Sequence, residues 1–117
     1  MGTADYMAPE QARDTSKADA CADIYSLGMT LWHLATGKVA YPGSSHAEKL
    51  LAHESAPVPS LSAALPGVSE MLDAAFSRMV AKLPGDRFKT MDQVVTALER
   101  CRHVESTGPS GNITADQ

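Results

Sequence analysis

The chain has 117 residues, of which 44% are hydrophobic and 21% are charged, and its formal net charge is −4. This length provides one domain or part of one, with the composition of a soluble globular protein. The acidic balance and an apolar stretch (residues 24–35) shorter than the roughly 20 residues of a membrane span argue against a nucleic-acid or membrane partner. With two cysteines and no export signal at its start, the chain is expected to be cytoplasmic.

Two helices are predicted near the N-terminus. Pro9 suits the first position of a helix, which predicts a short helix over residues 9–12. A longer helix is predicted from about residue 23 to residue 36, where Gly37 acts as a C-terminal stop. Its apolar residues lie nearly all round, a pattern typical of a buried helix. Either the later helices cover every face of it, or one face serves a partner.

Three more helical segments are predicted in the second half. Ser45 and Glu48 form a capping-box pattern that opens a helix ending near residue 54. The proline-rich residues 55–66 are predicted to form an irregular loop. Ser69 then caps a helix that runs to a turn at Pro84, and Thr90 begins a second capping box for the last helix.

The predicted fold class is all-α, because no strand pattern and no internal repeat is present. About five helical segments surround one buried central helix, and residues 1–103 form the folded part. Residues 104–117 are rich in Ser, Thr, Gly and Pro, and are predicted to be a disordered tail.

Metal and hydrolase chemistry are not expected from the side chains present. His46 and His53 are seven residues apart and lack the paired spacing of a zinc site, so both are predicted to face solvent. Ser26 and Ser69 have no recognisable His/Asp relay. No metal ligands are therefore assigned.

Three separated stretches carry a family resemblance. Residues 2–11 (Gly-Thr-Ala-Asp-Tyr-Met-Ala-Pro-Glu-Gln) resemble the end of the activation segment of bacterial-type serine/threonine protein kinases, which closes with Ala-Pro-Glu. Residues 23–28 (Asp-Ile-Tyr-Ser-Leu-Gly) resemble the start of the central helix of the kinase C-terminal lobe, and residues 84–88 (Pro-Gly-Asp-Arg-Phe) match a later turn. The resemblance covers about residues 2–100 and implies a partial kinase C-terminal lobe.

The resemblance implies roles for six residues. Glu10 and Arg87 are implied to form a buried ion pair that ties the activation segment to the last helices. Asp23 is the anchor of the central helix, and is expected to act here as its N-cap or a first-turn acid. A remnant of the substrate-docking loop is formed by Gly2, Thr3 and Tyr6, which are expected to be mobile.

The kinase groups that handle ATP are absent from this sequence. No Gly-rich loop, ATP-binding Lys, His-Arg-Asp or Asp-Phe-Gly occurs in it. ATP and Mg²⁺ therefore belong to the parental kinase domain, which phosphorylates Ser or Thr, and this chain alone is expected to be inactive and to bind no cofactor. Its expected partner is the missing kinase portion, as in a truncated or split gene. The alternative is a non-catalytic helical module that binds another protein.

Overall fold

The regular structure of this chain is helical in every part that the computed structural model describes, namely residues 3–14, 16 and 19–106. The helices are α1 (Pro9–Arg13), α2 (Ala20–Thr36), α3 (His46–Ser55), α4 (Leu61–Ala64), α5 (Glu70–Met79) and α6 (Met91–Ser106). Short 3-10 helices occur at Thr3–Asp5 and Pro84–Asp86. The predicted all-α class is confirmed, with one more α-helix than expected.

Asp19 and Gly37 cap the two ends of α2. The Asp19 side chain accepts a hydrogen bond from the backbone N–H of Ala22 at 3.0 Å, so the helix begins at Ala20 rather than near Asp23. Gly37 ends it in the left-handed conformation, with φ of 77°, as the sequence predicts.

The predicted serine and threonine caps of α3, α5 and α6 are all made. Ser45, Ser69 and Thr90 each accept a hydrogen bond from the backbone N–H three residues later, at 3.1, 3.1 and 3.2 Å. The last helix continues to Ser106, three residues beyond the predicted limit of the folded part. Residues 107–117 of the predicted tail lie outside the described residues, so their disorder stays a prediction.

The proline-rich loop contains a helix that the sequence pattern does not reveal. Ser60 follows Pro59 and accepts a hydrogen bond from Ala63 at 3.2 Å, which starts the four-residue helix α4. Helix α5 ends at Met79, earlier than the predicted turn at Pro84.

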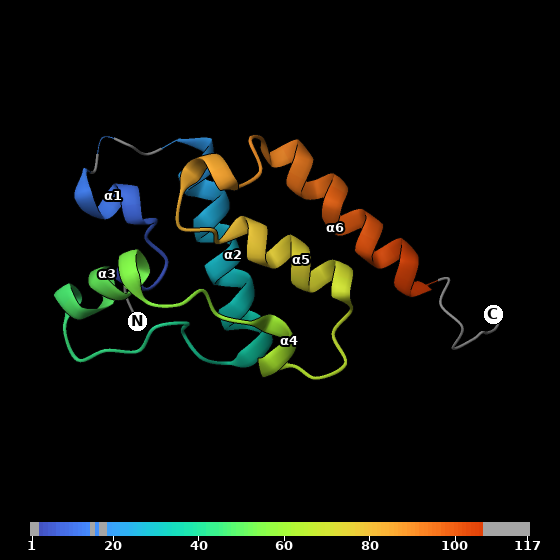
Figure 1. The fold of residues 1–117 in the computed structure, drawn as a ribbon, viewed down its shortest axis with the longest axis horizontal. Coiled ribbons are helices and arrows are strands. Elements are labelled where there is room, and N and C mark those ends of the chain that lie inside the picture. Colours follow the sequence, from blue (N-terminus) through green and yellow to red (C-terminus); the bar gives the residue numbers. More distant parts are fainter. Residues whose placement is uncertain (1–2, 15, 17–18, 107–117) are drawn as a thin grey trace.

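Helix α2 stands in the middle of the arrangement, with α5 and α6 on one side and α1 and α3 on the other (Figure 1). The core forms where α2 meets α5, around the fully buried residues Ile24, Tyr25, Met29, Phe76, Met79 and Val80. Gly28 permits this close contact, because a Cβ atom there would lie 2.5 Å from Val80 Cγ1. On the other side, α3 packs on α1 and on Thr3–Asp5.

One face of α2 is open, although its apolar residues lie nearly all round. The exposed fractions of Leu27 and Leu34 are 40% and 80%. These residues are seven apart, so they lie on the same side of the helix, with the half-buried Leu31 between them. The sequence left open whether the later helices cover every face of α2 or one face serves a partner. The first of these alternatives is wrong, because Leu27 and Leu34 are exposed.

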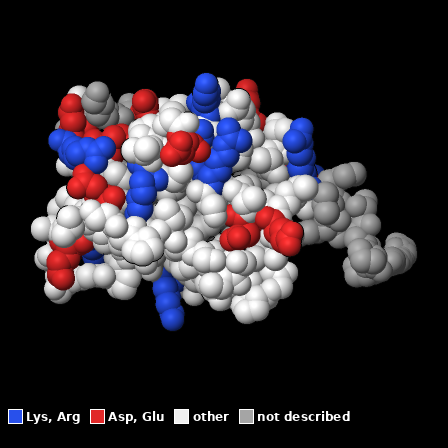
Figure 2. All heavy atoms as spheres, in the orientation of Figure 1, with Lys and Arg blue, Asp and Glu red and all other residues white. Residues whose placement is uncertain are grey.

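Charged side chains are unevenly spread over the face shown in Figure 2. The area over α4 and the loop that joins α2 to α3 is mostly uncharged, whereas acidic and basic side chains mix over α1 and the beginning of α2. Within the described residues, no helix has the length and apolar character that crossing a membrane requires.

Candidate functional site

The site includes an ion pair between the first and the last of the three stretches that carry the kinase resemblance. Arg87 follows the 3-10 turn Pro84–Asp86, and Glu10 lies in the first turn of α1. The guanidinium binds the carboxylate with two parallel hydrogen bonds, Nη1 to Oε2 at 2.6 Å and Nη2 to Oε1 at 2.9 Å. Arg87 is 1% exposed and Glu10 is 9% exposed, so the structure brings these two residues together inside the protein.

Every N–H of the Arg87 guanidinium has an acceptor. Besides the carboxylate, Nη1 donates to the Cys21 carbonyl at 3.0 Å, Nε donates to Ala81 at 2.8 Å, and Nη2 donates to Lys82 at 3.2 Å. Because a guanidinium has five N–H donors, this side chain is fully paired. It joins α1, the first turn of α2 and the loop that follows α5.

A second buried cluster lies on the other side of Tyr25, whose ring centre is 4.9 Å from Arg87 Cζ. We call Tyr25, Tyr41, His53 and Lys82 the His53 cluster. The Tyr25 hydroxyl is 2.6 Å from His53 Nδ1, and both residues are fully buried. The prediction that His53 faces solvent is wrong: α3 turns this residue toward α2, whereas His46 on the same helix is exposed.

Lys82 binds the C-terminal end of α3. Its ammonium donates hydrogen bonds to the backbone carbonyls of Ala52 and His53, at 3.2 and 2.8 Å, and to the Tyr41 hydroxyl at 2.9 Å. Tyr41 in turn donates to the Pro57 carbonyl at 2.9 Å. A cation at this place suits the negative end of the helix dipole.

Burial shifts the pKa values of all four residues of the cluster in the direction that favours their neutral forms. Removal from water, helped by the nearby Lys82 ammonium, lowers the pKa of His53 to about 4. Burial also lowers the pKa of Lys82 to about 8 and raises the pKa of Tyr41 to about 12. The pKa of Tyr25 is raised, mainly by burial. His53 is therefore neutral at pH 7.

Two ion pairs connect α3 with residues 4–13, which we call the N-terminal segment. Lys49 Nζ lies 3.0 Å from Oδ1 of Asp5, which is 2% exposed, and Arg13 contacts Glu54 at 2.5 Å on the surface. The backbone of Ala4 and of Asp5 also interacts with the His53 ring and raises its pKa against the effect of burial.

The remaining predicted site residues occupy separate places. Tyr6 is held against α2, with its hydroxyl 2.8 Å from His33 Nδ1 and its carbonyl accepting a bond from the Ser26 hydroxyl at 2.8 Å. Thr3 begins the first 3-10 helix, and Gly2 lies outside the described residues. Asp23 is exposed in the first turn of α2, so it serves as a first-turn acid while Asp19 is the cap.

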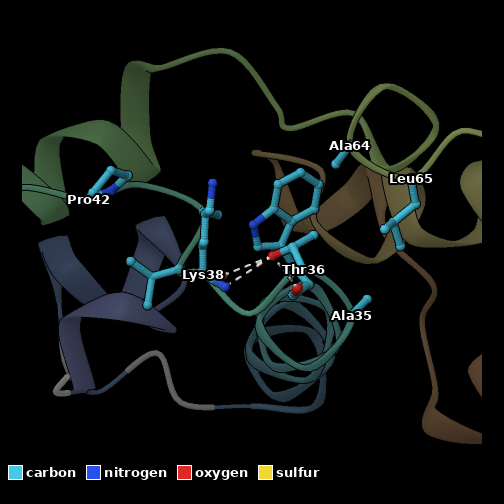
Figure 3. A pocket seen from close by; sticks show the side chains of 9 residues that line it. Ala35, Thr36, Lys38, Pro42, Ala64 and Leu65 are labelled. Carbon is cyan, nitrogen blue, oxygen red and sulfur yellow. Dashed lines mark hydrogen bonds between the residues drawn. The ribbon is translucent and has the colours of Figure 1, made fainter.

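A cavity of about 570 Å³ lies at the C-terminal end of α2, and Figure 3 shows the side chains that line it. Its walls are mainly apolar, and the polar side-chain atoms come from Trp32, Thr36 and Lys38. The full lining is Trp32, Ala35, Thr36, Lys38, Val39, Ala40, Pro42, Ala64 and Leu65. Thr36 is already bonded to the backbone of Trp32 and Lys38. The cavity shares no residue with the ion pair or the His53 cluster.

The ion pair and the His53 cluster hold α1, α2, α3 and the loop after α5 together. No described residues form a group of three or more His, Cys, Asp or Glu side chains placed to share a metal ion.

The resemblance pointed to Glu10 and Arg87, but nothing pointed to the His53 cluster. Its members are spread from residue 25 to residue 82. Apart from Tyr25, which lies on the predicted buried helix, none of them has a local pattern that indicates a buried position.

The chain is similar in sequence to bacterial serine/threonine protein kinases. It is 36% identical over 99 residues to the serine/threonine-protein kinase Pkn1 of Myxococcus xanthus, a match that covers 85% of this chain. It is 38% identical over 106 residues, 90% of this chain, to PknB of Mycobacterium tuberculosis. PknL of the same species is 36% identical over 88 residues, 75% of this chain.

These matches take up 14%, 17% and 22% of the three kinases. The chain thus spans less than a quarter of the length of the curated relatives it matches. No family model matches it. The relatives and the helical fold together confirm the resemblance to a bacterial serine/threonine kinase C-terminal lobe.

Proposed function

We propose, from its relationship to one segment of bacterial serine/threonine protein kinases, that this chain forms the acceptor side of such a catalytic domain. By acceptor side we mean the part beside which the Ser or Thr of the protein substrate lies. In a complete domain this chain would hold the end of the activation segment, beside which a Ser or Thr hydroxyl receives the γ-phosphoryl group of ATP. The observation that carries the proposal is the buried Glu10–Arg87 pair. It joins residues far apart in the chain, each within a stretch that resembles the kinases.

The chain's own part in that reaction is to position backbone. The Arg87 guanidinium fixes α1 relative to α2 and α5, and Tyr6 fixes the preceding residues against α2. Positioning of this kind is a large part of phosphoryl-transfer catalysis, because the protein does little covalent chemistry. ATP and Mg²⁺ would be bound by residues that this sequence does not contain, so the chain by itself is proposed to be inactive.

A chimera tests the proposal directly. The 106-residue segment of PknB that matches this chain is replaced by the corresponding residues of this chain. We expect the chimera to phosphorylate a Ser/Thr protein acceptor, and the same chimera with Arg87→Met to lose that activity. A folded chimera without activity, beside an active PknB control, would overturn the proposal.

The isolated chain provides the second arm of the test. We expect no ATP-dependent phosphorylation and no change in melting temperature with ATP and Mg²⁺. A clear stabilisation by ATP–Mg²⁺ would contradict the proposed lack of a nucleotide site, since a ligand that binds the native state raises its stability.

A second candidate function is a non-catalytic module that binds another protein through α2. The exposed side chains of Leu27 and Leu34 favour it, since apolar side chains grouped on one helix face mark interaction surfaces. The two candidates differ in what covers this face: the rest of a kinase domain in the first, an unrelated protein in the second.

A further inference from the structure

We propose that neutral His53 is a positioning residue: with Lys82 it fixes α3 on the core, and through α3 it holds the N-terminal segment formed by residues 4–13. As far as that segment is taken to be the acceptor side of a kinase, the proposal rests on the function proposed above. The coupling between the two parts of the fold stands on contacts within this chain.

Helix α3 has little apolar attachment: half-buried Ala52 packs against the core, but no apolar residue of α3 is fully buried. Its one fully buried residue is His53, whereas Leu51 is 63% exposed. A helix usually attaches to a core through an apolar stripe. Here the attachment is polar, through the Tyr25 hydroxyl at 2.6 Å and the Lys82 ammonium on the helix end.

The position of the N-terminal segment depends on its contacts with α3. Lys49 pairs with the buried Asp5, and Arg13 pairs with Glu54. Both Thr3–Asp5 and α1 pack on α3. A displacement of α3 from α2 would therefore remove these contacts and leave the segment attached to the core by the Glu10–Arg87 pair and by the contacts of Tyr6 with α2.

The groups around His53 disfavour a positive charge on its ring, because the Lys82 ammonium is already close to it. Facing it are Tyr25 from α2, Tyr41 from the loop before α3, Lys82 from the loop after α5 and Asp5 from the first 3-10 helix. Behind Tyr25 lies the Arg87 guanidinium with Glu10. The Asp5 carboxylate, which favours the charged ring, is already paired with Lys49.

In the neutral tautomer with its proton on Nε2, His53 accepts the Tyr25 hydroxyl proton at Nδ1, and protonation would remove that lone pair. An imidazolium has two donors and no acceptor. The protonated ring is then buried beside the Lys82 ammonium, which costs free energy through both desolvation and repulsion. Acid should accordingly expel His53 from the cluster, and α3 and the segment should open together while α5 and α6 stay closed.

Hydrogen exchange of the complete 117-residue chain, corrected for intrinsic rates, measures this opening at pH 7 and pH 4.5. If the open state restores an ordinary His pKa of about 6.5, the opening equilibrium for α3 and residues 4–13 should rise roughly 50-fold between these pH values. His53→Gln, which cannot titrate, should reduce that rise to less than about threefold. His46→Gln is the matched control on the exposed side of the same helix and should behave as the unmodified chain.

Two outcomes would overturn the proposal. One is an acid-dependent opening of α3 that is as large in His53→Gln as in the unmodified chain. The other is an NMR titration of the unmodified chain that gives His53 an ordinary pKa near 6.5, a measurement that needs no variant to fold. Neither readout involves phosphorylation, so a failure here is distinguishable from a failure of the PknB chimera.

Discussion

Arg87 is the residue whose loss we expect to destabilise the chain most. Arg87→Met keeps an apolar stem but leaves the Glu10 carboxylate buried without its partner. Breaking a buried ion pair from one side costs about 3–5 kcal/mol, a large part of the 5–15 kcal/mol that stabilises a typical domain. Urea unfolding followed by circular dichroism measures the loss.

Two companion substitutions separate geometry from charge. Arg87→Lys keeps the charge but cannot supply the five N–H donors of a planar fork, so it should lose more than half as much as Arg87→Met. Arg78→Met removes an exposed guanidinium that lies 4.3 Å from the centre of the Phe88 ring, and should cost less than about 1 kcal/mol. An unchanged midpoint for Arg87→Met would show that the pair contributes nothing.

His53 should make the stability of the chain depend on pH. Its pKa is lowered from 6.5 to about 4 in the folded chain, so between these values the unfolded chain binds more protons. The contribution is complete above pH 6.5, and is lost as the pH falls from 6.5 to 4, by up to about 3 kcal/mol. Urea unfolding at half-unit pH steps should show this slope, and His53→Gln should lack it; equal slopes in both proteins would contradict the assignment.

Arg87 and His53 also show what a single sequence can predict about individual residues. The partner of Arg87 was implied by the family resemblance, because both ends of the pair belong to recognisable stretches. His53 was assigned to solvent, because the class of a residue and its helical spacing do not tell which side of a polar helix faces the core. Only the three-dimensional meeting of α2, α3 and Lys82 makes it a buried residue.

At the scale of elements, the α2–α5 contact depends on Gly28. Gly28→Ala places a Cβ atom 2.5 Å from Val80 Cγ1 and 3.1 Å from Met79 Cβ, and neither buried side chain can move its crowded atom away easily. Overpacking costs about 1–3 kcal/mol and the better helix propensity of Ala returns about 1 kcal/mol, so we expect a net loss of up to about 2 kcal/mol. Thermal unfolding measures it. Gly85→Ala, with open space around it, is the control and should be nearly neutral.

Local chemistry predicted most helix boundaries, because caps are short-range. Ser45, Ser69, Thr90 and Gly37 each act within a few residues of their own position. Three boundaries were missed: α4 follows two prolines that suggested a loop, α2 begins three residues earlier than predicted because Asp19 is its cap, and α5 ends before the predicted turn. Arrangement in space was beyond such reasoning, since nothing local to α3 indicates that its attachment is polar.

At the scale of the whole molecule, the open face of α2 is the feature that an isolated helical domain leaves unexplained. Figure 1 shows α2 in the middle, yet Leu34 is 80% exposed. A central helix normally buries its large apolar side chains, since burying one contributes about 1.5–3 kcal/mol. The proposed kinase role explains the exposure, because the remainder of a catalytic domain would cover this side.

Leu34→Lys distinguishes a surface leucine from one that belongs to an interface. In the isolated chain the substitution should change the free energy of unfolding by less than about 0.5 kcal/mol, because the side chain is already in water and Lys suits the last turns of a helix. In the PknB chimera the same change should abolish phosphorylation, because it would place a charge in a buried contact. Leu51→Lys, at a 63% exposed position of α3, should be neutral in both proteins. If Leu34→Lys is neutral in an active chimera as well, the rest of the kinase does not cover this face, and the protein-binding module becomes the better explanation for it.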